Sequence, residues 1–243
     1  MLRFLGVLFA AGFVVFCGLA AGAGYVLWET SKTLPDTQQL ATYEPAVMTR
    51  VHAADGSLIA EFARERRLFV PVGAVPERLV HAFLSAEDKA FYDHPGVDWR
   101  SLVGAVVVNV QNKIDGNGRL IGASTITQQV AKNFLLTSDR TFDRKLKEAL
   151  LAFRIEEALS KDHILELYLN EIYLGLNSYG IAAAALNYFG KSLNDLTLAE
   201  MAYLAALPKA PNNYHPHRYP ERAVERRNLV LDRMLENGLV AEG

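Results

Sequence analysis

The residue types best suited to chemistry lie in the stretch S-A-E-D-K-A-F-Y-D-H-P-G, at positions 85–96. In a helix, Glu87, Phe91 and His94 would share one face, because they are four and seven residues apart. The preceding residues are largely apolar, so this helix is predicted to be buried. Burial disfavours a charged carboxylate, which raises its pKa and suits a general base near neutral pH. The alternative is a structural carboxylate that pairs with Lys89 or His94.

A second motif, G-A-S-T-I-T-Q-Q-V-A-K-N at positions 122–133, predicts a helical face of hydrogen-bond donors. Thr125, Gln128 or Gln129, and Lys132 fall on one stripe of this helix. Hydroxyl, amide and ammonium groups together suit phosphate or sugar oxygens. The alternative is local, because Thr125 and Gln128 also have the spacing of a helix capping box.

A third motif, R-K-L-K-E, places Arg144 and Lys145 four and three residues before Glu148. Taken alone, this spacing is typical of a surface ion-pair ladder that contributes only about a few tenths of a kcal/mol.

Two further motifs mix core and polar positions. K-D-H-I-L-E-L-Y-L-N-E-I-Y-L-G, at 161–175, has an apolar helical stripe, and R-R-N-L-V-L, at 226–231, alternates basic and core residues. His215 and His217 have the spacing of a metal-binding pair, but no third ligand lies near them in the sequence, so we exclude a metal site there.

The elements that must position these motifs are predicted to be mostly helices. The periodic stretches run from Arg78 to Phe91, Trp99 to Ile114, Ser124 to Leu135, Phe142 to Leu159, Ser160 to Leu174, Thr197 to Pro208 and Pro220 to Asn237. Thr197 and Glu200 form a capping-box pattern. Between residues 47 and 70, alternating apolar residues around Asp55-Gly56 predict a short β-hairpin.

The N-terminus carries the clearest compositional signal. Residues 4–28 contain no charged side chain, and roughly 20 apolar residues suffice to cross a membrane. Arg3 precedes this run, which places the N-terminus in the cytoplasm by the positive-inside rule. A cleaved signal peptide is the alternative, because Ala21-Gly22-Ala23 resembles a signal-peptidase site. The length of the run favours an uncleaved single-pass anchor, with the remainder of the chain extracytoplasmic.

Composition adds little about partners. With 27 acidic and 25 basic residues, the net charge of −2 gives no argument for nucleic-acid binding, and we expect none. The single cysteine, Cys17, cannot form an intrachain disulfide. We divide the chain into a cytoplasmic tip and anchor (1–28), a linker with the hairpin (29–76) and one helical domain (77–243).

In this order, the five motifs resemble the peptidoglycan glycosyltransferase domain shared by class A penicillin-binding proteins and monofunctional transglycosylases. They span residues 87–231, and the motif at 122–133 is the most specific. The resemblance implies a mainly α, lysozyme-like fold. The stretch G-L-N-S-Y-G-I-A-A-A-A-L-N-Y-F-G is more similar to the bifunctional proteins, in which a transpeptidase domain follows. No S-x-x-K motif of that domain occurs here, so we interpret the sequence as the glycosyltransferase part alone.

The resemblance also implies roles for individual residues. Glu87 would be the general base that deprotonates the acceptor's 4-hydroxyl, and Glu148 the second essential carboxylate. Lys132, Arg144 and Lys145 would bind the lipid pyrophosphate of the donor. The remaining expected substrate-site residues are Asp88, Phe91, His94, Ser124, Thr125, Gln128, Gln129 and Asn133. A divalent cation such as Mg²⁺ is expected to bridge the diphosphate, although the sequence shows no dedicated ligand cage.

The implied substrates are lipid II and the nascent glycan strand, at the outer face of the bacterial inner membrane. The bilayer and other cell-wall synthesis proteins are the expected partners. The apolar stretches Leu102–Val110 and Phe134–Leu136 would dip into lipid or, alternatively, pack in the core. Two rival functions remain: a lysozyme-like enzyme that cleaves glycan, which needs a second carboxylate beside the scissile bond, and a non-catalytic membrane scaffold.

Overall fold

The computed structural model describes residues 2–43, 49–55, 58–62, 66–116, 122–137 and 141–241. The chain is mainly α-helical, as predicted. Its helices are α1 (Leu2–Lys32), α2 (Gln38–Ala41), α3 (Glu77–Glu87), α4 (Trp99–Ile114), α5 (Ile126–Leu135), α6 (Phe142–Ala158), α7 (Lys161–Glu171), α8 (Ile181–Phe189), α9 (Leu198–Ala206) and α10 (Pro220–Glu236). Short 3₁₀ turns occupy Val72–Ala74, Leu193–Asp195 and Pro211–Asn213.

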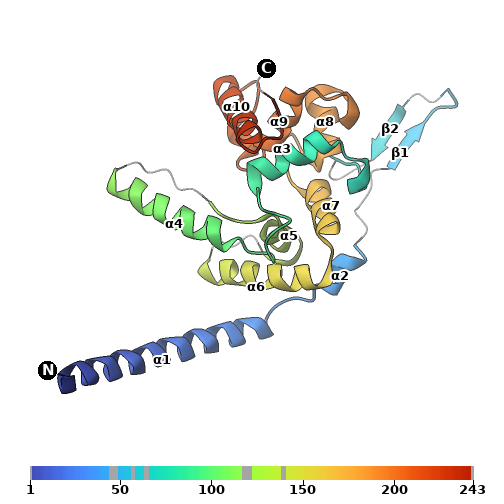
Figure 1. Ribbon diagram of the computed structural model, residues 1–243. Helices are drawn as coiled ribbons and strands as arrows, with labels where there is room; N and C mark the ends of the chain where they lie inside the picture. Colours follow the sequence, from blue (N-terminus) through green and yellow to red (C-terminus); the bar gives the residue numbers. More distant parts are fainter. Residues whose placement is uncertain are drawn as a thin grey trace.

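Helix α1 extends away from the folded body, as Figure 1 shows. Residues 12–32 of this helix are long and apolar enough to cross a membrane, and residues 12–29 are all exposed. Only the last turn docks onto the body. There Thr30 is buried, and Arg154 of α6 donates from Nη2 to the Ser31 carbonyl oxygen at 3.2 Å. The helix therefore joins the folded domain at one end and leaves its apolar surface uncovered.

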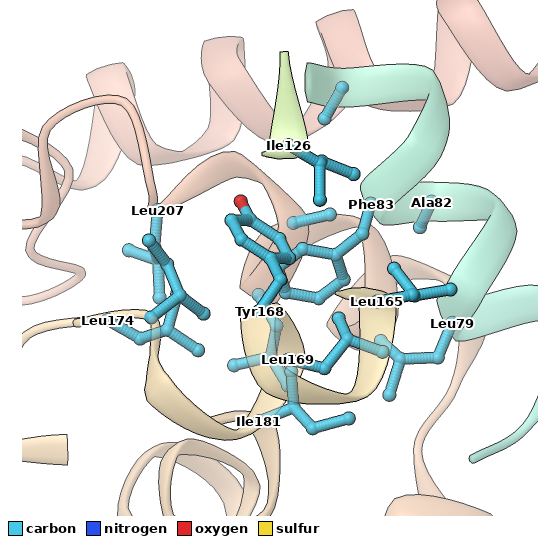
Figure 2. Packing of buried hydrophobic residues seen from close by; sticks show 14 of the residues in the cluster. Leu79, Ala82, Phe83, Ile126, Leu165, Tyr168, Leu169, Leu174, Ile181 and Leu207 are labelled. Carbon is cyan, nitrogen blue, oxygen red and sulfur yellow. The ribbon is translucent and has the colours of Figure 1, made fainter. Parts of the chain in front are cut away.

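The core lies where α3, α5, α7 and α9 meet (Figures 1 and 2). The rings of Phe83 and Tyr168 pack edge to face with centroids 6.2 Å apart, surrounded by aliphatic side chains such as Leu79 and Leu165. All four side chains are 1 % exposed or less. Fully burying one such side chain stabilises the fold by about 1.5–3 kcal/mol. The end of α3, which carries Glu87, is thus held by a close-packed core.

The helix predicted over Arg78–Phe91 is wrong at its C-terminal end, because α3 stops at Glu87. Asp88 has φ −160° and ψ 78°, outside the helical region. Glu87, Phe91 and His94 therefore do not share a helical face. The chain leaves the helix because Asp88 finds distant partners, described below, that a continuing helix could not give it.

Several other predicted boundaries are confirmed. Trp99–Ile114 is helical as predicted, and Thr197 and Glu200 form the expected capping box at α9.

Two other boundaries differ from the prediction. Thr125 and Gln128 also form a capping box, so α5 begins at Ile126 rather than Ser124. Helix α7 ends at Glu171, earlier than the predicted Leu174.

The predicted β-hairpin is present as strands β1 (Thr49–His52) and β2 (Leu58–Phe62), which pair antiparallel. Gly56 of the predicted turn lies outside the described residues. An unpredicted parallel pair joins β3 (Arg66–Arg67) to β4 (Ser178–Tyr179).

Helix α4 projects from the body and has no buried residue (Figure 1). Its valines Val103, Val106 and Val107 are all more than half exposed. Of the two predictions for Leu102–Val110, core packing is therefore wrong. In contrast, Phe134, Leu135 and Leu136 are partly buried and pack against the core.

Candidate active site

Glu87 lies between two cavities. The first, which we call the cationic cavity, has a volume of about 280 Å³ and is bounded by the ends of α3 and α9, by α5 and by α10. The second, the α4-side cavity, has a volume of about 400 Å³ and extends from Glu87 to α4 and the end of α10. Glu87, Ser124 and Arg233 line both cavities. One carboxylate can therefore face two ligands at once.

Gln129 is the direct partner of Glu87. Its side-chain Nε2 donates a hydrogen bond to Glu87 Oε2 at 2.9 Å. Burial raises the pKa of the Glu87 carboxyl above its ordinary value. The Gln129 hydrogen bond and the charges of Arg226, Arg233 and Lys209 oppose that rise. The carboxylate is thus held by one amide and lies beside several cations without a direct ion pair to a described residue.

Asp88 ties the end of α3 to the start of α5. Its Oδ2 accepts a hydrogen bond from the Ile126 backbone N–H at 2.9 Å, and its carboxylate lies 3.0 Å from His94 Nε2. The Gly96 N–H donates to His94 Nδ1 at 3.1 Å, so the ring proton is on Nε2 and is donated to Asp88. Asp88 and His94 are both buried. This arrangement fixes the backbone that follows Glu87.

Gly96 locks the following turn onto α6. Its φ is +98°, and an added Cβ would lie only 2.7 Å from the Ala152 carbonyl oxygen, so only glycine fits there without strain. The Gly96 carbonyl accepts a hydrogen bond from Thr125 Oγ1 at 2.6 Å. Lys161 donates from Nζ to the His94 carbonyl at 2.6 Å and pairs with Glu156 at 2.7 Å. The turn is therefore anchored to α5, α6 and α7.

Glu148 is buried on α6 and holds two cations. It pairs with Arg144, and Lys145 Nζ lies 2.7 Å from its Oε2. Lys145 also donates to Ser124 Oγ at 2.7 Å. Because Glu148 is only 3 % exposed, this is not the solvated surface ladder that the spacing alone would indicate.

Lys132 faces the cationic cavity without an ion pair to any described residue within 4.0 Å. Burial lowers the pKa of Lys132, and the nearby Arg144 and Lys145 lower it further, while Glu148 and Glu87 oppose the change. An anionic ligand in the cavity would supply the counter-charge that this ammonium group lacks.

Three cations of this cavity were not among the predicted site residues: Lys209, Arg226 and Arg233. Arg226 opens the R-R-N-L-V-L motif, which was the only sequence signal for it. Lys209 follows α9, and no pattern distinguished it. Arg233 donates from Nη1 to the Ala86 carbonyl at 2.8 Å, next to Glu87. With Lys132, these residues give the cavity four positive side chains.

The structure brings most of the predicted site residues together. The two cavities are lined by Glu87, Asp88, Ser124, Thr125, Gln128, Gln129, Lys132 and Glu148. Arg144 and Lys145 stand behind Glu148, and His94 stands behind Asp88. Phe91 is fully buried in the core, and Asn133 is exposed outside both cavities.

In this arrangement a partly buried carboxylate, Glu87, lies between a cation-lined cavity and a second cavity. Such a site suits group transfer with an anionic leaving group. Comparison with known protein families gives the same class. The transglycosylase family model matches residues 55–235. The chain therefore belongs to the transglycosylase family.

Individual relatives are similar over nearly the whole chain. Penicillin-binding protein 1A of Rickettsia felis is 48% identical over 97% of this chain and 29% of its own length. Penicillin-binding protein 1A of Neisseria flavescens is 50% identical over 87% of this chain and 26% of its own. The crystal structure of penicillin-binding protein 1A from Haemophilus influenzae has a TM-score of 0.44 and 32% identity, covering 82% of this chain and 20% of that one. The chain spans less than a third of the length of these relatives.

Proposed function

We propose that the chain is a peptidoglycan glycosyltransferase that polymerises lipid II into glycan strands. The donor is the growing strand, linked to a lipid pyrophosphate, and the acceptor is lipid II. The observation that carries this proposal is the position of Glu87, between the cationic cavity and the α4-side cavity. The family membership and the similarity to penicillin-binding proteins 1A support it.

In the proposed reaction, Glu87 is the general base. The acceptor occupies the α4-side cavity and donates its 4-hydroxyl proton to a Glu87 carboxylate oxygen. The hydroxyl oxygen then forms a bond to C1 of the donor sugar, and the bond from C1 to the diphosphate oxygen breaks with inversion. The raised pKa of Glu87 strengthens it as a base, and Gln129 holds its Oε2 in place.

The leaving group is a polyprenyl diphosphate, and negative charge grows on it as the bond to C1 breaks. Lys132, Lys209 and Arg226 line the cavity where this charge would form. Cations fixed in place before the reaction stabilise such a charge without the cost of reorganising solvent. Glu148 is proposed to act as a positioning carboxylate, because it orients Arg144 and Lys145 on the far side of the same cavity.

The described residues do not fit a protein-held Mg²⁺ site. They contain no group of three or more His, Cys, Asp or Glu side chains that could ligate an ion. Glu148 already accepts hydrogen bonds from Arg144 and Lys145. We therefore derive no step through a metal ion, and the expected divalent cation remains a prediction that a chelator would test.

The lipid substrate accounts for the apolar surfaces. We propose that α1 is a single-pass anchor in the inner membrane and that the folded domain lies on its outer side. The exposed valines of α4 would enter the bilayer beside the α4-side cavity, so that the polyprenyl tail stays in lipid while its head group reacts. Contacts with other cell-wall synthesis proteins remain an expectation.

The lysozyme-like alternative is less well supported, because it requires a second available carboxylate near the base. Asp88 is engaged by His94 and Ile126, and Glu148 by Arg144 and Lys145. A non-catalytic scaffold would have no need for a partly buried carboxylate, Glu87, in a cavity lined by four cations.

Product analysis distinguishes these functions. The purified chain is incubated with lipid II or with preformed glycan strands, each with and without a chelator, and products are separated by gel electrophoresis. We expect strands that lengthen with time from lipid II and no cleavage of preformed strands. Shortening of preformed strands without polymerisation would establish the hydrolase instead, and no product from either substrate would favour the scaffold.

A further inference from the structure

A groove at the end of the membrane helix belongs to neither cavity of the active site. We call it the anchor groove. It has a volume of about 690 Å³ and is formed by residues 32–35 after the apolar run of α1, residues 135–137 at the end of α5, and the first turns of α6. Lys32 and Leu34 form its anchor side, and Arg144 and Lys147 its α6 side.

The described residues of the groove carry more positive than negative charge. Among the described residues, Lys32, Arg144 and Lys147 line it, against one carboxylate, Asp143. Each cation has a partner: Lys147 lies 2.8 Å from Asp143, Lys32 lies 3.2 Å from the exposed Glu29, and Arg144 pairs with Glu148. The three cations that line the groove favour an anionic ligand.

The position of the groove indicates where that ligand comes from. The apolar run of α1 ends with Tyr25 and Trp28, aromatic residues of the kind that lie at the level of lipid head groups. Lys32 Nζ lies 3.3 Å from the centroid of the Trp28 ring, one helical turn nearer the folded domain. The groove therefore begins at the depth where phospholipid phosphates are found. Its apolar lining residues, Leu34 and Leu136 among them, suit the glycerol and first methylenes of a lipid.

We propose that the anchor groove binds the phosphodiester head group of an anionic phospholipid from the surrounding membrane. The proposal rests on α1 lying in a bilayer but does not depend on the transferase reaction. Because Arg144 lines the groove and also pairs with Glu148, a bound lipid phosphate would touch the residue behind the cationic cavity. The lipid would thereby fix the anchor against α6 and the adjoining catalytic residues.

The test uses the full chain in detergent and Trp28 as a built-in probe. The sequence has two tryptophans, so a Trp99→Phe background leaves Trp28 as the only one. Dihexanoyl phosphatidylglycerol and dihexanoyl phosphatidylcholine are titrated separately while Trp28 emission is recorded. Native mass spectrometry of the same samples counts the bound lipids independently of the probe. We expect saturable binding of the anionic lipid and at least tenfold weaker binding of the zwitterionic one.

Lys147→Gln isolates the contribution of the groove, because it leaves Lys32 and the active-site residues unchanged. We expect about fivefold weaker binding of phosphatidylglycerol, the effect of one cation near an anionic surface. Lys147→Arg should retain binding. Lys191→Gln is the matched control, since Lys191 also forms an ion pair, 2.7 Å from Glu200, but lines neither the groove nor the active site. It should leave the affinity unchanged.

Three results would overturn the proposal. The first is equal affinity for the two lipids, or no binding by either readout. The second is an affinity in Lys147→Gln equal to that of the Lys191→Gln control. The third is tighter binding of inorganic diphosphate than of phosphatidylglycerol with the same dependence on Lys147, which would assign the groove to the diphosphate of the substrate. All three are measured without turnover, so they are independent of failure of the proposed enzyme activity.

Discussion

Replacing Gln129 by leucine tests whether the protonation state of Glu87 governs the rate. The Gln129 amide donates to the charged carboxylate at 2.9 Å, and such a bond favours the ionised form. Its loss therefore raises the pKa of Glu87 further above its ordinary value, since the effect of burial is then less opposed. A hydrogen bond to a charged group contributes about 1.5–3 kcal/mol of stabilisation to the charged form. A difference of about 1.36 kcal/mol corresponds to a pKa shift of one unit.

A general base works only when it is deprotonated. The acidic limb of the pH–rate profile must therefore move to higher pH in this variant. We expect a shift of about one pH unit in Gln129→Leu, after allowing for partial replacement of the lost bond by water. Gln129→Glu, which places a second carboxylate beside Glu87, should shift the limb further in the same direction. The assay is kcat/KM for lipid II polymerisation between pH 5 and 9, because this ratio reports the free enzyme.

The control for this experiment is Gln111→Leu, the same change on the exposed face of α4, which should leave the limb in place. If the acidic limb of an active Gln129→Leu enzyme does not shift, a group other than Glu87 controls the rate. The assignment of Glu87 as the base would then be refuted.

Three further predictions follow from packing and charge. Gly96→Ala should lower the free energy of unfolding by at least about 2 kcal/mol, because the new Cβ would lie 2.7 Å from the Ala152 carbonyl oxygen. Denaturant unfolding measures this free energy. The control is Gly73→Ala, whose Cβ would have no atom within 4 Å and which should change the free energy of unfolding little. Lys132→Met should reduce the single-turnover rate of polymerisation about 10²–10³-fold, with little change in the free energy of unfolding. A near-normal rate would show that Lys132 does not stabilise the leaving group. Glu148→Leu should lower the free energy of unfolding by about 2 kcal/mol in the same unfolding assay, because Arg144 and Lys145 lose their buried partner. An unchanged free energy of unfolding would contradict that pairing.

The sequence alone predicted those elements whose signals are local. Trp99–Ile114 could be bounded correctly because Asp98 caps its start and a polar loop follows its end. The capping box at Thr197 was readable for the same reason: donor and acceptor lie three residues apart. Such patterns need no knowledge of the rest of the fold.

Elements that depend on distant partners could not be predicted. Asp88 ends α3 because it binds the Ile126 N–H, 38 residues away, and a periodic pattern cannot contain that contact. Helix α8 was missed because Ala182–Ala185 are all buried, so no polar face marks the helical period. It starts after Gly180, whose φ of +80° allows the backbone to approach the Asn170 carbonyl closely.

The candidate site divides in the same way. Glu87, Gln129 and Lys132 were predicted because residue types and spacing placed them in motifs. Lys209 and Arg233 were not, since each is an ordinary surface-type residue until α9 and α10 fold against α3 and bring it beside Glu87. Phe91 was expected at the substrate site but lies in the core, because α3 ends before it.

The central claim is that Glu87 removes the acceptor proton while the cationic cavity receives the diphosphate. The most direct test is Glu87→Gln, which keeps the size of the side chain and its place beside Gln129 but cannot accept the proton. We predict that this variant unfolds at the same denaturant concentration as the parent or a higher one, still binds lipid II, and forms no glycan polymer at any pH. Polymerisation by folded Glu87→Gln at a rate near that of the parent would contradict the account.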